Sequence, residues 1–174
     1  MLMTERIGSN FQIGDVVVYA RHGVGKIENV VDLDFRGEIY SSYAIKMKAT
    51  GVELFVPTQS AKTMGLRHLQ SSSDIDKALE ILSSNQEIEE LAVLKTWKER
   101  KKILDEMFRS CSPLDLAKII KFLYGKNNVK DLPNSERKVY DMAFKFLIHE
   151  LSEVKGISEP EADHMLAELL IQNH

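Results

Sequence analysis

The chain has 174 residues, of which 44% are hydrophobic, and a formal net charge of -3. This length suffices for one medium domain or two small ones, and no apolar run approaches the roughly 20 residues that span a bilayer. The single Cys111 excludes an internal disulfide and a cysteine-based metal cluster, and residues 1–6 lack the basic start and apolar core of a signal peptide. We therefore expect a cytoplasmic protein with no membrane partner.

The first 70 residues have the composition of a small β domain. Four segments are rich in β-branched and aromatic residues, namely 16–19, 26–33, 39–47 and 52–56, and glycines stand at the turns between them. Four or five short strands in this space indicate a strongly bent barrel of the SH3 or Tudor type, because a flat sheet of this size buries little. Pro57 should end the last strand, and a short helix closed by Gly65 is expected at 58–64.

The rest of the chain is predicted to be helical. A polar linker at 71–74 separates the predicted β domain, residues 1–70, from a helical domain, residues 75–174, so the fold class is α+β with a Tudor-like barrel followed by an all-α bundle. Apolar spacing and end signals predict helices over about 74–82, 87–95, 96–108, 113–125, 134–155 and 159–171. Capping boxes are predicted at Thr96-x-x-Glu99 and at Ser158-x-x-Glu161.

Charge is distributed unevenly along this helical part. Residues 74–94 carry one basic and six acidic side chains, whereas residues 95–126 carry nine basic and four acidic ones. The basic block is where a phosphate backbone would be attracted. Its alternative interpretation is a solvated helix face with no ligand.

The only tryptophan, Trp97, stands at the head of the basic block. Periodicity places it within the apolar stripe of its helix, so it could be a core anchor of the bundle. The capping box favours a second interpretation, in which Trp97 is the first helical residue and projects beyond the bundle, beside backbone N–H groups that favour an anion. Four basic residues would then surround it, namely Lys98, Arg100, Lys101 and Lys102. An aromatic wedge among cations suits the edge of a nucleic-acid duplex.

Enzymatic chemistry is not indicated. The glycines near Lys26 fit neither a phosphate-binding loop nor a dinucleotide-binding turn, and the five histidines show no metal-ligand spacing. No catalytic constellation, cofactor or small-molecule substrate is therefore expected.

Two motifs in order carry a family resemblance. The first is the strand Gly14-Asp15-x-Val17-Val18-Tyr19 followed by His22-Gly23-Val24-Gly25, and the second is Trp97-x-x-Arg100. The opening strand alone occurs in many small barrels, but the ordered pair resembles the CarD (CarD/CdnL) family of bacterial transcription regulators over nearly the whole chain from Phe11 onward.

This resemblance implies a non-enzymatic mechanism. The barrel of such proteins docks on the RNA polymerase β subunit, and the helical domain lies against promoter DNA at the upstream edge of the melted bubble. Carried onto this chain, Trp97 is the wedge in the minor groove, and Arg100, Lys101 and Lys102 are candidates for phosphate contact. Localisation would be cytoplasmic, at the nucleoid through polymerase.

The chain departs from some relatives in its predicted polymerase-facing surface. Where some relatives place arginines, this chain has Leu33 and Phe55. The contact is therefore expected to be more apolar, through Leu33, Phe35, Arg36, Leu54 and Phe55. Pairing along an exposed edge strand would add backbone hydrogen bonds. Phe55 has the alternative of a core position in the barrel.

Three functions follow as hypotheses. The first is stabilisation of the open promoter complex by tethered, weak and sequence-independent DNA contact. The second is a protein–protein adaptor on polymerase, with Trp97 buried and no DNA contact. The third is an autonomous architectural DNA-binding protein, which would bind free DNA tightly.

Overall fold

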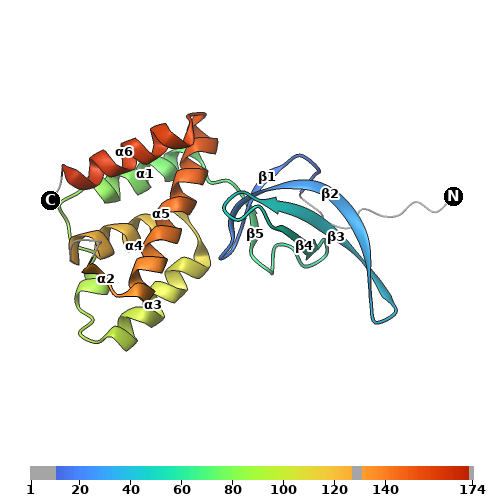
Figure 1. Ribbon diagram of the computed structural model, residues 1–174, viewed down its shortest axis with the longest axis horizontal. Coiled ribbons are helices and arrows are strands. Elements are labelled where there is room, and N and C mark those ends of the chain that lie inside the picture. The colour runs from blue at the N-terminus through green and yellow to red at the C-terminus, as the bar shows by residue number, and fades with distance from the viewer. Residues whose placement is uncertain (1–10, 127–130, 173–174) are drawn as a thin grey trace. The chain divides into compact units, whose positions relative to one another are not determined.

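The computed structural model describes residues 11–126 and 131–172. The chain divides into two compact units, residues 1–68 and 69–174, which we describe separately (Figure 1). The expectation that residues 1–6 form no signal peptide lies outside the described residues. Among the described helices, none is long and apolar enough to cross a membrane.

The first unit is a five-stranded antiparallel sheet. Its order is β4-β3-β2-β1-β5, so β4 and β5 are the two edges and the sheet is open. The closed barrel expected from the sequence is therefore not seen. The strands are β1 (Val16–Tyr19), β2 (Gly23–Phe35), β3 (Glu38–Met47), β4 (Glu53–Pro57) and β5 (Leu66–His68). Strands β1 to β4 fall where the β-rich segments predicted them, but Pro57 ends β4 and not the last strand, because β5 follows it.

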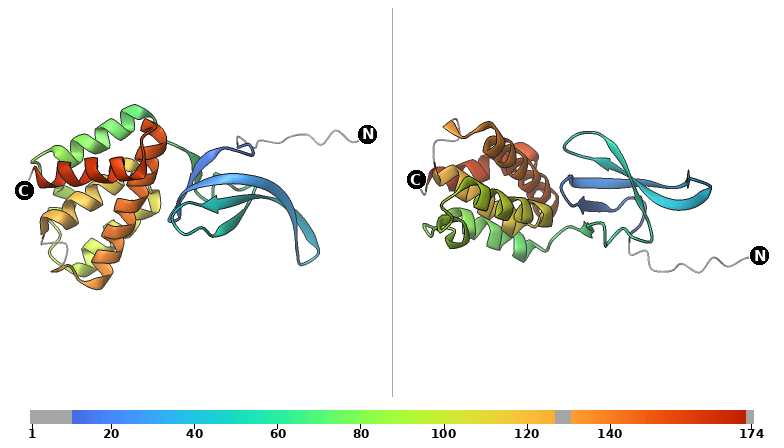
Figure 2. Two further views of the ribbon diagram at one scale, coloured as in Figure 1. Left: turned by 45° about the horizontal axis from the view of Figure 1, so that its top comes forward. Right: turned by 90° about the horizontal axis from the view of Figure 1, so that it is seen from below.

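Strands β2 and β3 are much longer than the others and form a hairpin that extends past the rest of the sheet (Figures 1 and 2). Its two-residue loop is Arg36-Gly37, with φ of 56° and 85°, because such a tight turn suits the twist of the strands only with both residues left-handed. A register shift between Ile27 and Asn29 marks a bulge, which bends β2 where the hairpin leaves the core.

The core of this unit lies on one face of the sheet. Its buried members come from all five strands and from the segments before β1 and after β4, namely Phe11, Val17, Ile27, Tyr43, Ile45, Met47, Val56, Ala61 and Leu66. Tyr43 closes one end by donating its hydroxyl to the Phe11 carbonyl at 3.3 Å. The prediction of a short helix at 58–64 is wrong. This segment forms successive turns, in which the Met64 N–H donates to the Ser60 carbonyl, and the chain then enters β5 after Gly65.

The second unit is a helical bundle built around α4. The helices that pack on α4 are α1, α3 and α5, while α6 lies beside α1 and α5 (Figures 1 and 2). Their bounds are α1 (Ser72–Ser83), α2 (Glu89–Ala92), α3 (Trp97–Ser110), α4 (Pro113–Lys126), α5 (Asn134–Lys155) and α6 (Glu159–Ile171). Helix α4 is buried on most sides, and Leu116, Ile120 and Leu123 are fully enclosed.

Helix ends mostly follow the sequence signals. Capping boxes form at Thr96 and at Ser158, as predicted, and Ser112 caps α4 by accepting from the Asp115 N–H at 3.1 Å. Two helices differ most from the expectation. Helix α1 begins at Ser72, inside the predicted linker, because the Ser71 hydroxyl accepts from the Asp74 N–H. Helix α2 has only four residues where 87–95 was expected, and its N-cap position, Ile88, makes no side-chain cap.

Candidate nucleic-acid and protein interfaces

Trp97 is the first residue of α3 and is half-buried. It continues the buried stripe of α3, in which Leu104 and Met107 pack into the bundle, yet it is not itself enclosed. The fully buried core anchor is therefore not what the structure shows. Trp97 is partly covered by the protein and partly accessible to solvent at the start of α3.

The capping box fixes the backbone at this point. The Glu99 N–H donates to the Thr96 hydroxyl at 3.3 Å, and the Thr96 N–H donates to the Glu99 carboxylate at 3.1 Å. The bond from the Thr96 N–H to the carboxylate, followed by the effect of the Thr96 side chain, holds the pKa of Glu99 below its ordinary value. The carboxylate also places a negative charge at the helix start, where the sequence interpretation expected N–H groups to favour an incoming anion.

Three of the four predicted cations are exposed to solvent. Lys98, Lys101 and Lys102 are exposed, and residues four apart on a helix are neighbours. Lys101 therefore lies next to Trp97 on the surface of α3, and Lys102 lies next to Lys98. This arrangement gives one side of the helix start a positive surface that adjoins the accessible part of the indole.

The fourth predicted cation, Arg100, has a different environment. Its guanidinium is half-buried, and Nη1 donates to the carbonyls of Leu94 (3.1 Å) and Lys95 (3.2 Å). Its Nε is shielded from solvent. Arg100 thus binds the chain's own backbone in this structure, and the phosphate contact expected of it is not supported.

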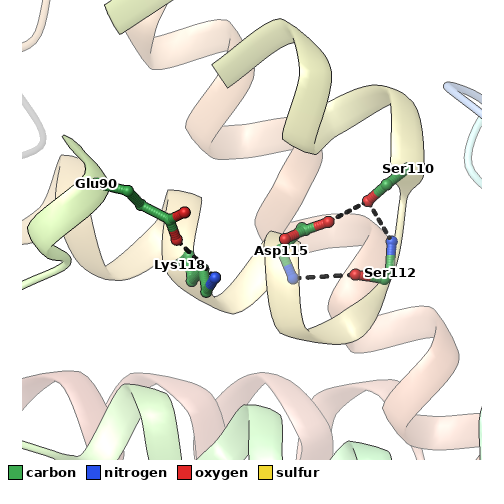
Figure 3. Close-up of polar contacts among 5 residues, drawn as sticks. All are labelled: Glu90, Ser110, Ser112, Asp115 and Lys118. Atoms are coloured by element: carbon green, nitrogen blue, oxygen red, sulfur yellow. Dashed lines mark hydrogen bonds and ion pairs between the residues drawn. The ribbon is translucent and has the colours of Figure 1, made fainter. Parts of the chain in front are cut away.

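The other end of α3 and the short α2 are tied to α4 (Figure 3). Cys111 takes a left-handed conformation (φ 52°) that ends α3, and the Ser110 hydroxyl then donates to the Asp115 carboxylate while accepting from the Ser112 N–H at 3.3 Å. On the same helix, Lys118 pairs with Glu90 of α2 at 2.6 Å. Helix α3 is therefore held at its C-terminal end, and α2 is fixed just before the segment that leads to Trp97.

Replacing Thr96 by alanine is expected to destabilise the helical unit by about 1 kcal/mol, because the N-cap bond to Glu99 is lost. The wild-type box contributes fully above the ordinary glutamate pKa and loses its contribution as the pH falls through the lowered pKa of Glu99. Urea unfolding between pH 7 and 3 measures both effects.

Ser158→Ala is the matched control, since it removes the same kind of box from α6. Both variants should lose similar stability, but only Thr96→Ala should make Trp97 more accessible to acrylamide quenching. Equal quenching in the two variants would show that the Thr96 box does not fix Trp97.

A second candidate surface lies on the sheet face opposite the core. Side chains alternate along β3, so Tyr40 lies on the face opposite Tyr43 and Ile45, and cross-strand partners share a face. By this register, the outer face carries four exposed apolar side chains, which we call the outer stripe: Leu33, Phe35, Tyr40 and Phe55. The Arg36 guanidinium stands 5.4 Å from the centre of the Phe35 ring.

The outer stripe includes three of the five predicted polymerase-facing residues, and Arg36 adjoins it. Phe55 is 46% exposed, so its alternative placement in a barrel core is wrong. Leu54 alternates with Phe55 along β4 and packs against the core beside Val56, so it does not lie on the outer face. Tyr40 does lie on the outer face, and although the sequence prediction did not include it, the alternation along β3 places it there.

Comparisons with known proteins cover both units. Residues 11–69 match the family model described as "CarD-like/TRCF RID domain", which implies interaction with RNA polymerase, and residues 77–167 match "CarD, C-terminal domain". The chain is also 32% identical, over 151 residues, to a Bacillus subtilis (strain 168) protein named "Putative transcription factor YdeB". That alignment covers 87% of this chain and 96% of the relative. Together these matches show that the chain belongs to the CarD family, a family of transcription factors that act through RNA polymerase.

Proposed function

We propose that this protein stabilises the open complex of RNA polymerase at promoters. The sheet unit docks on the polymerase β subunit, and the helical unit presents Trp97 to the minor groove at the upstream edge of the bubble. The observation that carries this proposal is the half-buried Trp97 at the first position of α3, flanked by exposed Lys98, Lys101 and Lys102. The buried part of the indole holds its orientation, and the accessible part is available to insert at an unstacked base step.

Docking on polymerase is supported by the outer stripe and by the edge strand. Strand β4 is an edge of the sheet and carries Phe55 on the outer face, so a partner strand could pair with its backbone while the stripe supplies apolar contact. Tethering in this way raises the local concentration of the helical unit at DNA. The few accessible cations on α3 then suffice, although the whole protein is acidic.

The lysines should act on DNA through charge alone. Three phosphate contacts predict that the logarithm of DNA affinity falls with the logarithm of salt concentration with a slope of about −2.7. Lys102→Ala should reduce this slope by about 1 and weaken binding equally on unrelated sequences. Fluorescence anisotropy of labelled forked DNA across a salt series measures this, with Lys145→Ala on α5 as an exposed control outside α3. A slope unchanged by Lys102→Ala would exclude this lysine from the DNA contact.

One observation favours the adaptor alternative, in which the protein binds polymerase without touching DNA. Glu99 and Arg100 both act within the protein, so the positive surface of α3 is smaller than the sequence suggested. The salt-slope experiment and the open-complex measurements below distinguish the two functions. If the protein is only an adaptor, changes at Trp97 or at the three lysines alter neither the salt slope nor the open-complex lifetime.

A further inference from the structure

Arg100 reaches back across the start of its own helix. It is the fourth residue of α3, and its Nη1 donates to the carbonyls of Leu94 and Lys95, which precede the capping residue Thr96. Hydrogen bonds from an ionised donor are among the stronger ones in proteins. One side chain thus joins the first turn of α3 to the segment that enters it.

That segment connects two fixed points. Upstream, Leu91 of α2 is fully buried, and Glu90 is paired with Lys118 of α4. Downstream, α3 is packed through Leu104. Residues 93–96 lie between the two helices. The Thr96 carbonyl accepts the first helical hydrogen bond of α3, from the Arg100 N–H, and Arg100 Nη1 supplies a partner to each of the Leu94 and Lys95 carbonyls.

Trp97 and Arg100 are three residues apart and therefore neighbours on the surface of α3. The backbone that Arg100 holds ends two residues before Trp97. If that backbone were released, the first turn of α3 could fray, and the indole would lose the contact that now leaves it half-buried. With the spacing Trp-x-x-Arg, the arginine side chain can reach back to the backbone that precedes the helix. The same side chain lies beside the tryptophan at the first helical position.

We infer that Arg100 is a positioning residue: it clamps the Leu94–Lys95 backbone so that Trp97 is presented in one orientation, and it makes no contact with phosphate. The consequence for transcription rests on the proposed function. The positioning itself belongs to the free protein and can be measured there, because Trp97 is the sole tryptophan and reports its own mobility.

The test compares Arg100→Met with Lys102→Met, since each removes one positive charge from α3 and leaves an unbranched stem. Time-resolved fluorescence anisotropy of the free, full-length variants gives the fraction of fast depolarisation of Trp97. We expect at least a twofold rise of that fraction in Arg100→Met, with the salt slope of DNA binding unchanged. In Lys102→Met, the slope should fall by about 1 with the anisotropy unchanged.

Arg100→Lys sharpens the distinction, because lysine keeps the charge but is a point donor without the planar fork of arginine. Positioning predicts that Trp97 stays mobile in this variant, whereas a phosphate contact predicts behaviour close to wild type. The inference is overturned if Arg100→Met lowers the salt slope by about 1 and leaves Trp97 as ordered as in the wild type. Should Arg100→Met not fold, the anisotropy of Arg100→Lys decides alone: a mobile Trp97 supports the positioning role, and a Trp97 as ordered as in the wild type overturns it.

The two sets of measurements distinguish failure of the proposed function from failure of the positioning role of Arg100. If Arg100→Met mobilises Trp97 but Trp97→Ala leaves open complexes unaltered, the positioning stands and the wedge fails. If Trp97→Ala shortens the open-complex lifetime while Arg100→Met leaves Trp97 ordered, the wedge stands and the positioning fails.

Discussion

Open promoter complexes formed with the Trp97→Ala variant are expected to dissociate about tenfold faster than those formed with the wild type. Stacking of one base on an aromatic side chain is worth about 1–3 kcal/mol by alanine substitution, and about 1.4 kcal/mol corresponds to a factor of ten. The effect appears as a shorter lifetime because the indole is proposed to hold only the melted form. A protein with equal affinity for closed and open complexes would not change the equilibrium between them.

The lifetime is measured by challenging preformed complexes with a competitor and following the decay of promoter-bound polymerase. Trp97→Phe retains an aromatic ring and should recover part of the lifetime. Ile171→Ala, an exposed apolar position on α6, should behave as the wild type. Lifetimes that are equal with Trp97→Ala, with the wild type and without the protein would eliminate the wedge.

The second large effect is expected at the outer stripe. Replacing Phe35 and Phe55 together by alanine should weaken binding to polymerase by about 100-fold or more. An aromatic anchor in an interface typically contributes at least about 2 kcal/mol. Both side chains are exposed, with accessible fractions of 65% and 46%, so the unit should fold normally without them. Binding of the full-length variant to RNA polymerase core enzyme, measured by surface plasmon resonance, gives the affinity.

Ile39→Ala provides the matched control on the same hairpin. Ile39 pairs with Asp34 and lies on the face opposite Phe35, and it is even more exposed, at 73%. Its loss should leave polymerase affinity within about twofold of the wild type. If Ile39→Ala weakens binding as much as Phe35→Ala does, the outer stripe is not the docking face.

Local features of the fold could be predicted from the sequence. Ser112, Ser158 and Thr96 each begin a helix as expected, because an N-cap depends on side chains within three residues of one another. The open sheet could not be predicted in the same way. Whether β4 meets β5 depends on pairing between segments about ten residues apart and on the bend that the bulge at Ile27 introduces into β2.

The candidate interfaces show the same difference between features set by local sequence and features set by distant segments. Exposure of Lys98 and Lys101 follows from helical periodicity, whereas the internal bonds of Arg100 depend on where the Leu94–Lys95 backbone passes, which no local pattern specifies. Leu54 is a different case. The alternation of β4 alone places it on the face opposite Phe55, because successive side chains of a strand point to opposite faces.

Photo-crosslinking from position 97 tests the central claim most directly. A benzoylphenylalanine placed there, in otherwise wild-type protein, is irradiated in complexes of polymerase with promoter DNA, and the crosslinked nucleotides are mapped. The account predicts crosslinks at the upstream edge of the bubble that require polymerase and disappear in the Phe35→Ala, Phe55→Ala background. Crosslinks to protein alone, or identical crosslinks on free DNA without polymerase, would contradict it.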